Sequence, residues 1–124
     1  MSAHSTPEAV VQQQLEAYNA RNLDAWLATC AVDGRQFEFP AKLLATGHAE
    51  LRERTAVRFQ EPNLNARLLS RAVMGNIVID HESVTRTFPE GTWSVDLVRI
   101  YEIRAGKIQT ASFIFGERTL DPKS

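Results

Sequence analysis

Cysteine and histidine are scarce in this sequence, and its charges nearly cancel. The 124 residues include one cysteine and three histidines, and the formal net charge is −1 at pH 7. A lone cysteine excludes an intramolecular disulfide and fits a reducing compartment, so we expect a cytoplasmic protein. Basic residues cluster at 52–58, but Glu50, Glu53 and Glu61 interleave with them. This balance gives no electrostatic attraction for nucleic acid or an anionic membrane, and we expect neither as a partner.

Other absences narrow the class of protein further. No apolar run is long enough to span a bilayer, and the first ten residues lack the basic start and apolar run of a signal peptide. There is no glycine-rich phosphate loop and no internal repeat. His4, His48 and His81 lie far apart, so the sequence offers no metal-ligand spacing. We therefore predict neither a metal nor a cofactor.

The residues that are present suffice for one domain with its own core. Hydrophobic residues make up 44% and charged residues 23% of the chain, as is usual for globular domains. We predict a single domain over residues 1–124, in which 1–6 and 119–124 are tails.

Three helices are predicted in the first half of the chain. Thr6-Pro7 combines a hydroxyl cap with a proline at the first helical position. Asn22 caps a short second helix that includes Cys30, and Thr46-Gly47 begins a third helix that Pro62 closes off.

Strands are predicted for most of the remaining chain. After an Asp33-Gly34 turn, alternating apolar residues indicate a short strand at 35–40. Longer strands are predicted at 64–74, 76–88, 93–105 and 107–116, and the turn signals between them are Gly75-Asn76, Glu90-Gly91 and Ala105-Gly106. This order predicts an α+β domain in which three N-terminal helices pack on a curved, mostly antiparallel sheet.

Several segments together resemble a known superfamily. They are "VVQQQLEAYNARNLDAWLATCAVD", then a short strand ending in proline, then "GHAELRE" and the closing "GKIQTASFIFGE". From about residue 8 to 118 the chain resembles the SnoaL-like and ketosteroid-isomerase-like branch of the nuclear transport factor 2-like superfamily. The resemblance implies a cone-shaped α+β fold with a ligand pocket between the helices and the concave sheet. It also implies dimerisation through the outer face of the sheet.

The resemblance does not extend to the catalytic residues of the isomerases. Those enzymes use a tyrosine on the first helix, an aspartate before a strand-end proline and a second acid late in the sheet. The corresponding positions here are Gln14, Phe39 and Arg99. A phenylalanine cannot shuttle a proton, so steroid isomerase activity is not expected.

Arg99 is the most informative residue, because it lies within the apolar strand "VDLVRIYEI". A turn centred on Glu90-Gly91 pairs Glu82 with Arg99 and Asp80 with Tyr101 on one face of the sheet. We predict Arg99, Glu82, Asp80 and Tyr101 as the candidate catalytic residues. Arg99 would bind an anionic or carbonyl group, one acid would act as base, and the phenol would donate a hydrogen bond.

The candidate ligand-binding residues are those on the helix faces, the first strand and the inner strand faces. They are Gln14, Tyr18, Trp26, Phe39, Leu97, Ala111, Phe113 and Phe115. The leading hypothesis is a domain that binds a small, largely apolar carbonyl or carboxylate compound and isomerises or cyclises it without a cofactor.

Two alternatives remain open. In the first, the protein is a non-catalytic dimeric ligand-sensing or structural module, and pairs such as Glu82–Arg99 and Asp80–Arg71 only stabilise the sheet. In the second, it hydrates an epoxide, as the limonene-epoxide-hydrolase branch does with an Asp-Arg-Asp cluster.

The outer face of the sheet is predicted to be unusually apolar. Ile108 and Ile114 are expected there beside Val98 and Ile100, and His81 is expected on the same face. No helix remains to cover this surface, so we predict a homodimer through it.

Overall fold

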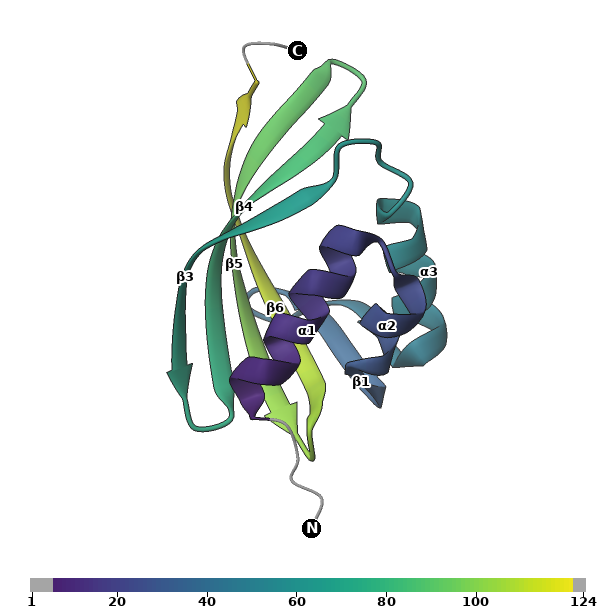
Figure 1. The fold of residues 1–124 in the computed structure, drawn as a ribbon, viewed down its shortest axis with the longest axis vertical. Coiled ribbons are helices and arrows are strands. Elements are labelled where there is room, and N and C mark those ends of the chain that lie inside the picture. The colour runs from purple at the N-terminus through teal and green to yellow at the C-terminus, as the bar shows by residue number, and fades with distance from the viewer. Residues whose placement is uncertain (1–5, 122–124) are drawn as a thin grey trace.

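The computed structural model describes residues 6–121, which form three helices and one six-stranded sheet (Figure 1). The helices are α1 (Pro7–Ala20), α2 (Leu23–Ala28) and α3 (Gly47–Arg58). The strands are β1 (Cys30–Glu38), β2 (Lys42–Thr46), β3 (Asn65–Met74), β4 (Ile77–Phe88), β5 (Gly91–Arg104) and β6 (Lys107–Leu120). The predicted α+β class is confirmed, although β1 and β2 lie between the second and third helices, and β6 extends beyond its predicted end.

Local capping explains where the first two helices begin. The Thr6 hydroxyl accepts a hydrogen bond from the Ala9 amide at 3.1 Å, and Pro7 follows as the first helical residue. Asn22 caps α2 by accepting from the Ala25 amide at 3.1 Å. Both predicted helix starts are confirmed. They could be predicted because each cap involves residues at most three positions apart in the chain.

The sheet is mixed, with the strand order β2-β1-β6-β5-β4-β3. Every neighbouring pair is antiparallel except β1 and β6, which are parallel. Strand β1 begins at Cys30 and runs through Asp33 and Gly34. The predictions of a turn at Asp33-Gly34 and of a helical Cys30 are therefore wrong, because this segment pairs with the distant β6.

Two of the three predicted hairpin turns are confirmed, and the third is displaced by one residue. Gly75-Asn76 and Ala105-Gly106 connect their strands as predicted. Between β4 and β5, however, Phe88 pairs with Gly91, so Pro89 and Glu90 are the central turn residues. Proline is favoured at the first central position of a type I turn and glycine at its end, which explains the displacement.

The displaced turn shifts the register of β4 against β5 by two residues. Asp80 lies opposite Arg99, and Glu82 lies opposite Leu97, instead of the predicted pairing of Glu82 with Arg99. Because side chains alternate with a period of two, this shift leaves every side chain on its predicted face.

All three helices cover one face of the sheet (Figure 1), and the core lies between them. The most deeply buried apolar side chains include Val10 and Val11 of α1, Leu51 of α3 and Val78 of β4. Asp80 and Glu82 are as deeply buried, at 0% and 1% exposed. Two carboxylates therefore lie within the apolar layer of the inner face, and each needs a compensating cation.

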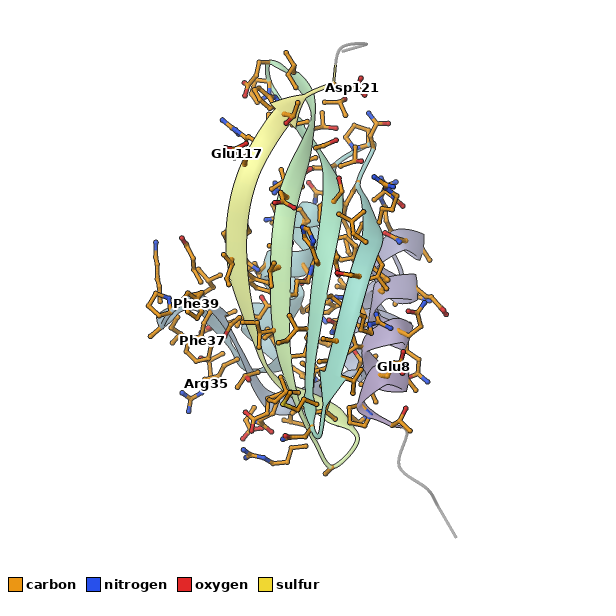
Figure 2. The ribbon with its side chains drawn as sticks, turned by 90° about the vertical axis from the view of Figure 1, so that its left-hand side faces the viewer. Glu8, Arg35, Phe37, Phe39, Glu117 and Asp121 are labelled. Atoms are coloured by element: carbon orange, nitrogen blue, oxygen red, sulfur yellow. The ribbon has the colours of Figure 1, made fainter. Side chains whose placement is uncertain are left out.

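The opposite face of the sheet carries no helix among residues 6–121 (Figure 2). Ile79 and Ile114 are each 39% exposed there. Ile108 is buried instead, because a bulge beside Thr110 turns it toward the helices, so its predicted place on the outer face is wrong. None of the helices in this part of the chain is long and apolar enough to cross a bilayer.

Candidate functional site

A small cavity lies between the helices and the inner face of the sheet. Its volume is ≈ 30 Å³, and one water needs about 10–15 Å³ by the same measure. Every element except β2, β3 and β4 contributes to its wall. The lining residues are Tyr18, Trp26, Gln36, Arg54, Thr55, Arg58, Leu97, Arg99, Phe113 and Phe115.

Arg99 reaches this cavity from β5 and is fixed there by Glu82. Its Nε donates to Glu82 Oε1 at 2.9 Å, and its guanidinium carbon lies 5.0 Å from the centre of the Tyr18 ring. The Phe113 ring lies 5.6 Å from the same carbon. A guanidinium has five N–H donors. One is bonded to Glu82, and the hydroxyl oxygens of Tyr18 and Tyr101 lie close enough to interact with others. The orientation of the Arg99 guanidinium is thus fixed, while other N–H groups remain available to a ligand.

Nearby charge and burial determine the protonation states of Arg99 and Tyr101. Burial alone would lower the pKa of Arg99, but the Glu82 carboxylate outweighs burial and raises the pKa above its usual range. Burial raises the pKa of Tyr101, and the nearby Arg99 offsets only part of that rise. Arg99 is therefore a permanent cation, and Tyr101 is a permanently protonated phenol at neutral pH.

Asp80 belongs to a separate, closed ion pair. Arg71 Nε and Nη2 donate to its two oxygens at 2.7 and 2.9 Å, and Arg71 Nη1 donates to Gln12 Oε1 at 3.0 Å. The predicted pairing of Asp80 with Arg71 is confirmed. Of the four candidate catalytic residues, Arg99 alone lines the cavity, and Asp80, Glu82 and Tyr101 lie behind its wall.

Helix α3 adds two arginines that the sequence reasoning missed. Arg54 donates to Gln36 Oε1 at 2.9 Å and forms no ion pair with any carboxylate of residues 6–121. Arg58 lies 3.7 Å from Glu61 Oε2, but Glu61 is engaged by Arg86 at 2.7 Å. Burial lowers the pKa of both α3 arginines, and repulsion between like charges lowers it further.

Two further donors on the cavity wall have no hydrogen-bond acceptor among the described residues. These are the Tyr18 hydroxyl and the Trp26 indole Nε1, on side chains 6% and 3% exposed. The Tyr18 oxygen lies near the guanidinium groups of Arg58 and Arg99 and helps to keep them charged. A buried donor without an acceptor costs about 1–3 kcal/mol. Both donors are therefore placed to meet an acceptor inside the cavity.

The wall contains no carboxylate and no histidine. His81 lies on the other face of the sheet, as expected, where it contacts Asp96. Within residues 6–121, no three His, Cys, Asp or Glu side chains gather as metal ligands would. The cavity thus offers many donors of hydrogen bonds and no titratable base.

The eight candidate ligand-binding residues divide into three groups. Tyr18, Trp26, Leu97, Phe113 and Phe115 lie on the cavity wall. Gln14 and Ala111 line a smaller neighbouring cavity, and Gln14 Nε2 donates to the Thr29 hydroxyl at 2.8 Å. Phe39 is 54% exposed and lies at the margin of the molecule (Figure 2), just beyond the end of β1. The β1 side chain that is buried toward the helices is Gln36.

The sequence matches a family model over most of its length. Residues 11–111 match the SnoaL-like domain, so the chain belongs to the SnoaL-like family of the nuclear transport factor 2-like superfamily. This confirms the resemblance seen in the sequence. No curated protein matches the chain.

Solved structures share the fold at low sequence identity. An uncharacterised cystatin-fold protein from Novosphingobium aromaticivorans has a TM-score of 0.82 at 22% identity, over 89% of this chain and 98% of its own. The epoxide hydrolase/cyclase-like enzyme SalBIII has a TM-score of 0.80 at 14% identity, over 89% and 90%. TerC co-crystallised with polyporic acid has a TM-score of 0.77 at 17% identity, over 90% and 92%. At these identities the similarity establishes the fold alone.

Proposed function

We propose that this protein binds a small, largely apolar organic molecule through a carboxylate, enolate or carbonyl oxygen placed against Arg99. The observation that carries the proposal is the donor-rich wall, in which Arg99, Tyr18 and Trp26 converge on one cavity. The rings of Phe113 and Phe115 supply the apolar part of the same wall. An oxygen that accepts several of these donors would satisfy groups that are otherwise buried without partners.

Such a cavity is suited to reactions that build negative charge on an oxygen. Donors placed in advance around a developing oxyanion each contribute about 10²–10³ in rate. Cyclisation onto a carbonyl develops that charge when an anionic nucleophile that the substrate itself carries attacks the carbonyl carbon and the C=O electron pair moves to the oxygen. Isomerisation through an enolate would also need a base to accept the proton, and the wall holds none. Glu82 then acts by holding the Arg99 plane, because its own carboxylate is buried behind the wall.

Two structural neighbours are consistent with this class of ligand. TerC was crystallised with polyporic acid, and SalBIII takes part in pyran ring formation in the polyether salinomycin. A cyclase-type activity on an acidic or carbonyl compound is therefore our preferred reaction.

Epoxide hydration has less support. An acid that activates water must reach the cavity, whereas Asp80 is closed off by Arg71, and Glu82 by Arg99. A non-catalytic module would bind the same ligand without converting it. A measurement of product formation from the bound compound therefore distinguishes a sensor from an enzyme.

Binding of benzoate, measured by calorimetry and thermal shift, tests the proposal. Arg99→Met alone leaves Glu82 buried and unpaired, so the matched variant is the double substitution Glu82→Gln with Arg99→Met. We expect benzoate to raise the melting temperature of the wild type and to leave the folded double variant unchanged. An equal shift in both proteins, or no shift in the wild type, would overturn the proposal.

The uncovered sheet face supports a homodimer in solution. Ile79 and Ile114 are partly exposed there with no helix above them. Light scattering is expected to give twice the chain mass for the wild type and the chain mass for Ile114→Arg. A monomeric wild type would show that the predicted homodimer is wrong, and the proposal for the cavity would be unaffected.

A further inference from the structure

We infer that the ligand of this cavity is a compact organic dianion, whose second negative charge is bound by Arg54 and Arg58 of α3. The inference rests on the proposed function and names the class of compound that the same site takes. Three observations carry it: the balance of charge, the placement of the two arginines on their helix, and the depth at which each donor lies.

The charge around the cavity is not balanced by the protein. The guanidinium groups of Arg54, Arg58, Arg86 and Arg99 meet the carboxylates of Glu61 and Glu82. Glu82 is engaged by Arg99 and Glu61 by Arg86, so four positive charges face two negative ones. Glu50 and Glu53 are exposed at the rim and pair with neither α3 arginine. Glu61 is shared between Arg86 and Arg58, so two positive charges remain in excess, and Arg54 has no ion pair among residues 6–121.

The two α3 arginines repel each other across one face of the helix. They are four residues apart, so they lie on the same face of α3. Like charges at this spacing destabilise a helix, and burial and mutual repulsion lower the pKa of Arg54. An anion between them would relieve the repulsion.

The donors lie at two depths. Tyr18, Trp26 and Arg99 line only the inner cavity. Arg54 and Arg58 line both this cavity and an open groove of ≈ 640 Å³. The other residues of the groove are Leu44, Val57, Arg86 and the glutamates Glu50, Glu53 and Glu61. A ligand that places one anionic oxygen against Arg99 can therefore bring a second one to the mouth, where the α3 pair lies.

Two kinds of compound carry this chemistry. A dicarboxylate has two separate anionic groups, and a phosphate monoester has both charges on one head group. Guanidinium groups bind either kind through paired hydrogen bonds. The shared requirement is a charge of −2 on a compact frame, because the inner cavity holds little more than one functional group.

Calorimetry at low salt with benzoate, phthalate and phenyl phosphate tests the inference. We expect at least one dianion to bind the wild type about tenfold or more tightly than benzoate does, since a second charge-assisted contact forms. Arg54→Gln and Arg58→Gln should each weaken dianion binding more than benzoate binding, so that the ratio falls to about threefold or less. The matched control is Arg52→Gln on the same helix, where an exposed ion pair with Asp24 lies outside the cavity.

The outcomes separate this inference from the proposed function. Tighter binding of phthalate or of phenyl phosphate supports the inference and identifies which kind of dianion is preferred. If benzoate binds through Arg99 but no dianion binds more tightly, the inference is wrong and the proposed function stands. An unchanged dianion preference in both α3 variants also overturns it, and failure of all three compounds to bind the wild type removes both.

Discussion

Two arginine–carboxylate pairs lie side by side on the inner face of the sheet, and they differ in how completely each is satisfied. Arg71 uses three nitrogens, two for Asp80 and one for Gln12. Arg99 gives its Nε to Glu82 and presents its plane to two aromatic rings and a cavity. The first pair is closed, and the second is open to a ligand.

This difference distinguishes a structural ion pair from a functional one more clearly than burial does. Asp80 and Glu82 are both almost fully buried, and both arginines are at most 10% exposed. What differs is the number of guanidinium donors left unused and what faces them. We therefore assign the sheet-stabilising role to Arg71–Asp80 and the ligand-facing role to Arg99.

The largest expected effect comes from breaking the closed pair. Asp80→Asn leaves the Arg71 cation buried without a counter-charge, and we expect a loss of about 3–5 kcal/mol in the free energy of unfolding. Urea denaturation measures it. Arg52→Gln removes only an exposed pair and should cost less than about 1 kcal/mol. A cost for Asp80→Asn as small as that of the control would contradict the closed-pair assignment.

Breaking the open pair should cost less and should be repaired by a ligand. Glu82→Gln leaves Arg99 unpaired beside a cavity that admits water, and we expect a loss of about 2–3 kcal/mol. Benzoate should raise the melting temperature of this variant more than that of the wild type, because the ligand replaces the lost charge. An Asp80→Asn variant should show no such gain. Equal responses of the two variants would mean that the pairs do not differ in function.

How far the sequence predicts these pairs depends on the range of the interactions involved. The alternation in β4 and β5 placed Asp80, Glu82, Arg99 and Tyr101 on one face, and this held although the Pro89-Glu90 turn shifted the register by two residues. The start of α1 at Thr6-Pro7 and the other hairpin turns were also predictable, because each rests on a few neighbouring residues.

Long-range pairing was not predictable from the same patterns. The parallel alignment of β1 with β6 joins segments about seventy-five residues apart, and it determines that Gln36 faces the helices while Phe39 does not. The α3 arginines were missed because interleaved glutamates made residues 52–58 resemble a solvated face. The four-residue spacing of Arg54 and Arg58 was the available signal, but its meaning depends on which side of α3 meets the sheet.

Cys30 is a buried thiol for which the effect of burial outweighs the opposing effects of hydrogen bonds to Thr29 and Gln14 and of the Lys107 charge. Burial raises the pKa of its thiol from 9.0 to about 11. The unfolded chain therefore loses this proton first, so the contribution to stability is complete below pH 9 and is lost as the pH rises toward 11. At pH 10 the loss is about 1.4 kcal/mol. Urea unfolding of the wild type and Cys30→Ala at pH 8 and pH 10 measures it, and the same pH dependence in both would contradict it.

The smallest expected effect is a gain in stability. Arg54→Gln removes a repelled cation from the cavity mouth, and we expect the ligand-free protein to gain about 0.2–0.5 kcal/mol. Urea denaturation at low salt measures the change, and added salt should reduce it. A clear loss of stability would show that Arg54 contributes more to the fold through Gln36 than it costs in repulsion.

A crystal structure of the protein with 4-bromobenzoate tests the central claim most directly. Anomalous scattering from bromine locates the ring without ambiguity. We expect the carboxylate within about 3 Å of Arg99 and the Tyr18 hydroxyl, with the ring extending from the inner cavity toward the groove beside Arg54 and Arg58. A carboxylate bound elsewhere on the molecule, while Arg99 keeps only its contact with Glu82, would contradict the account.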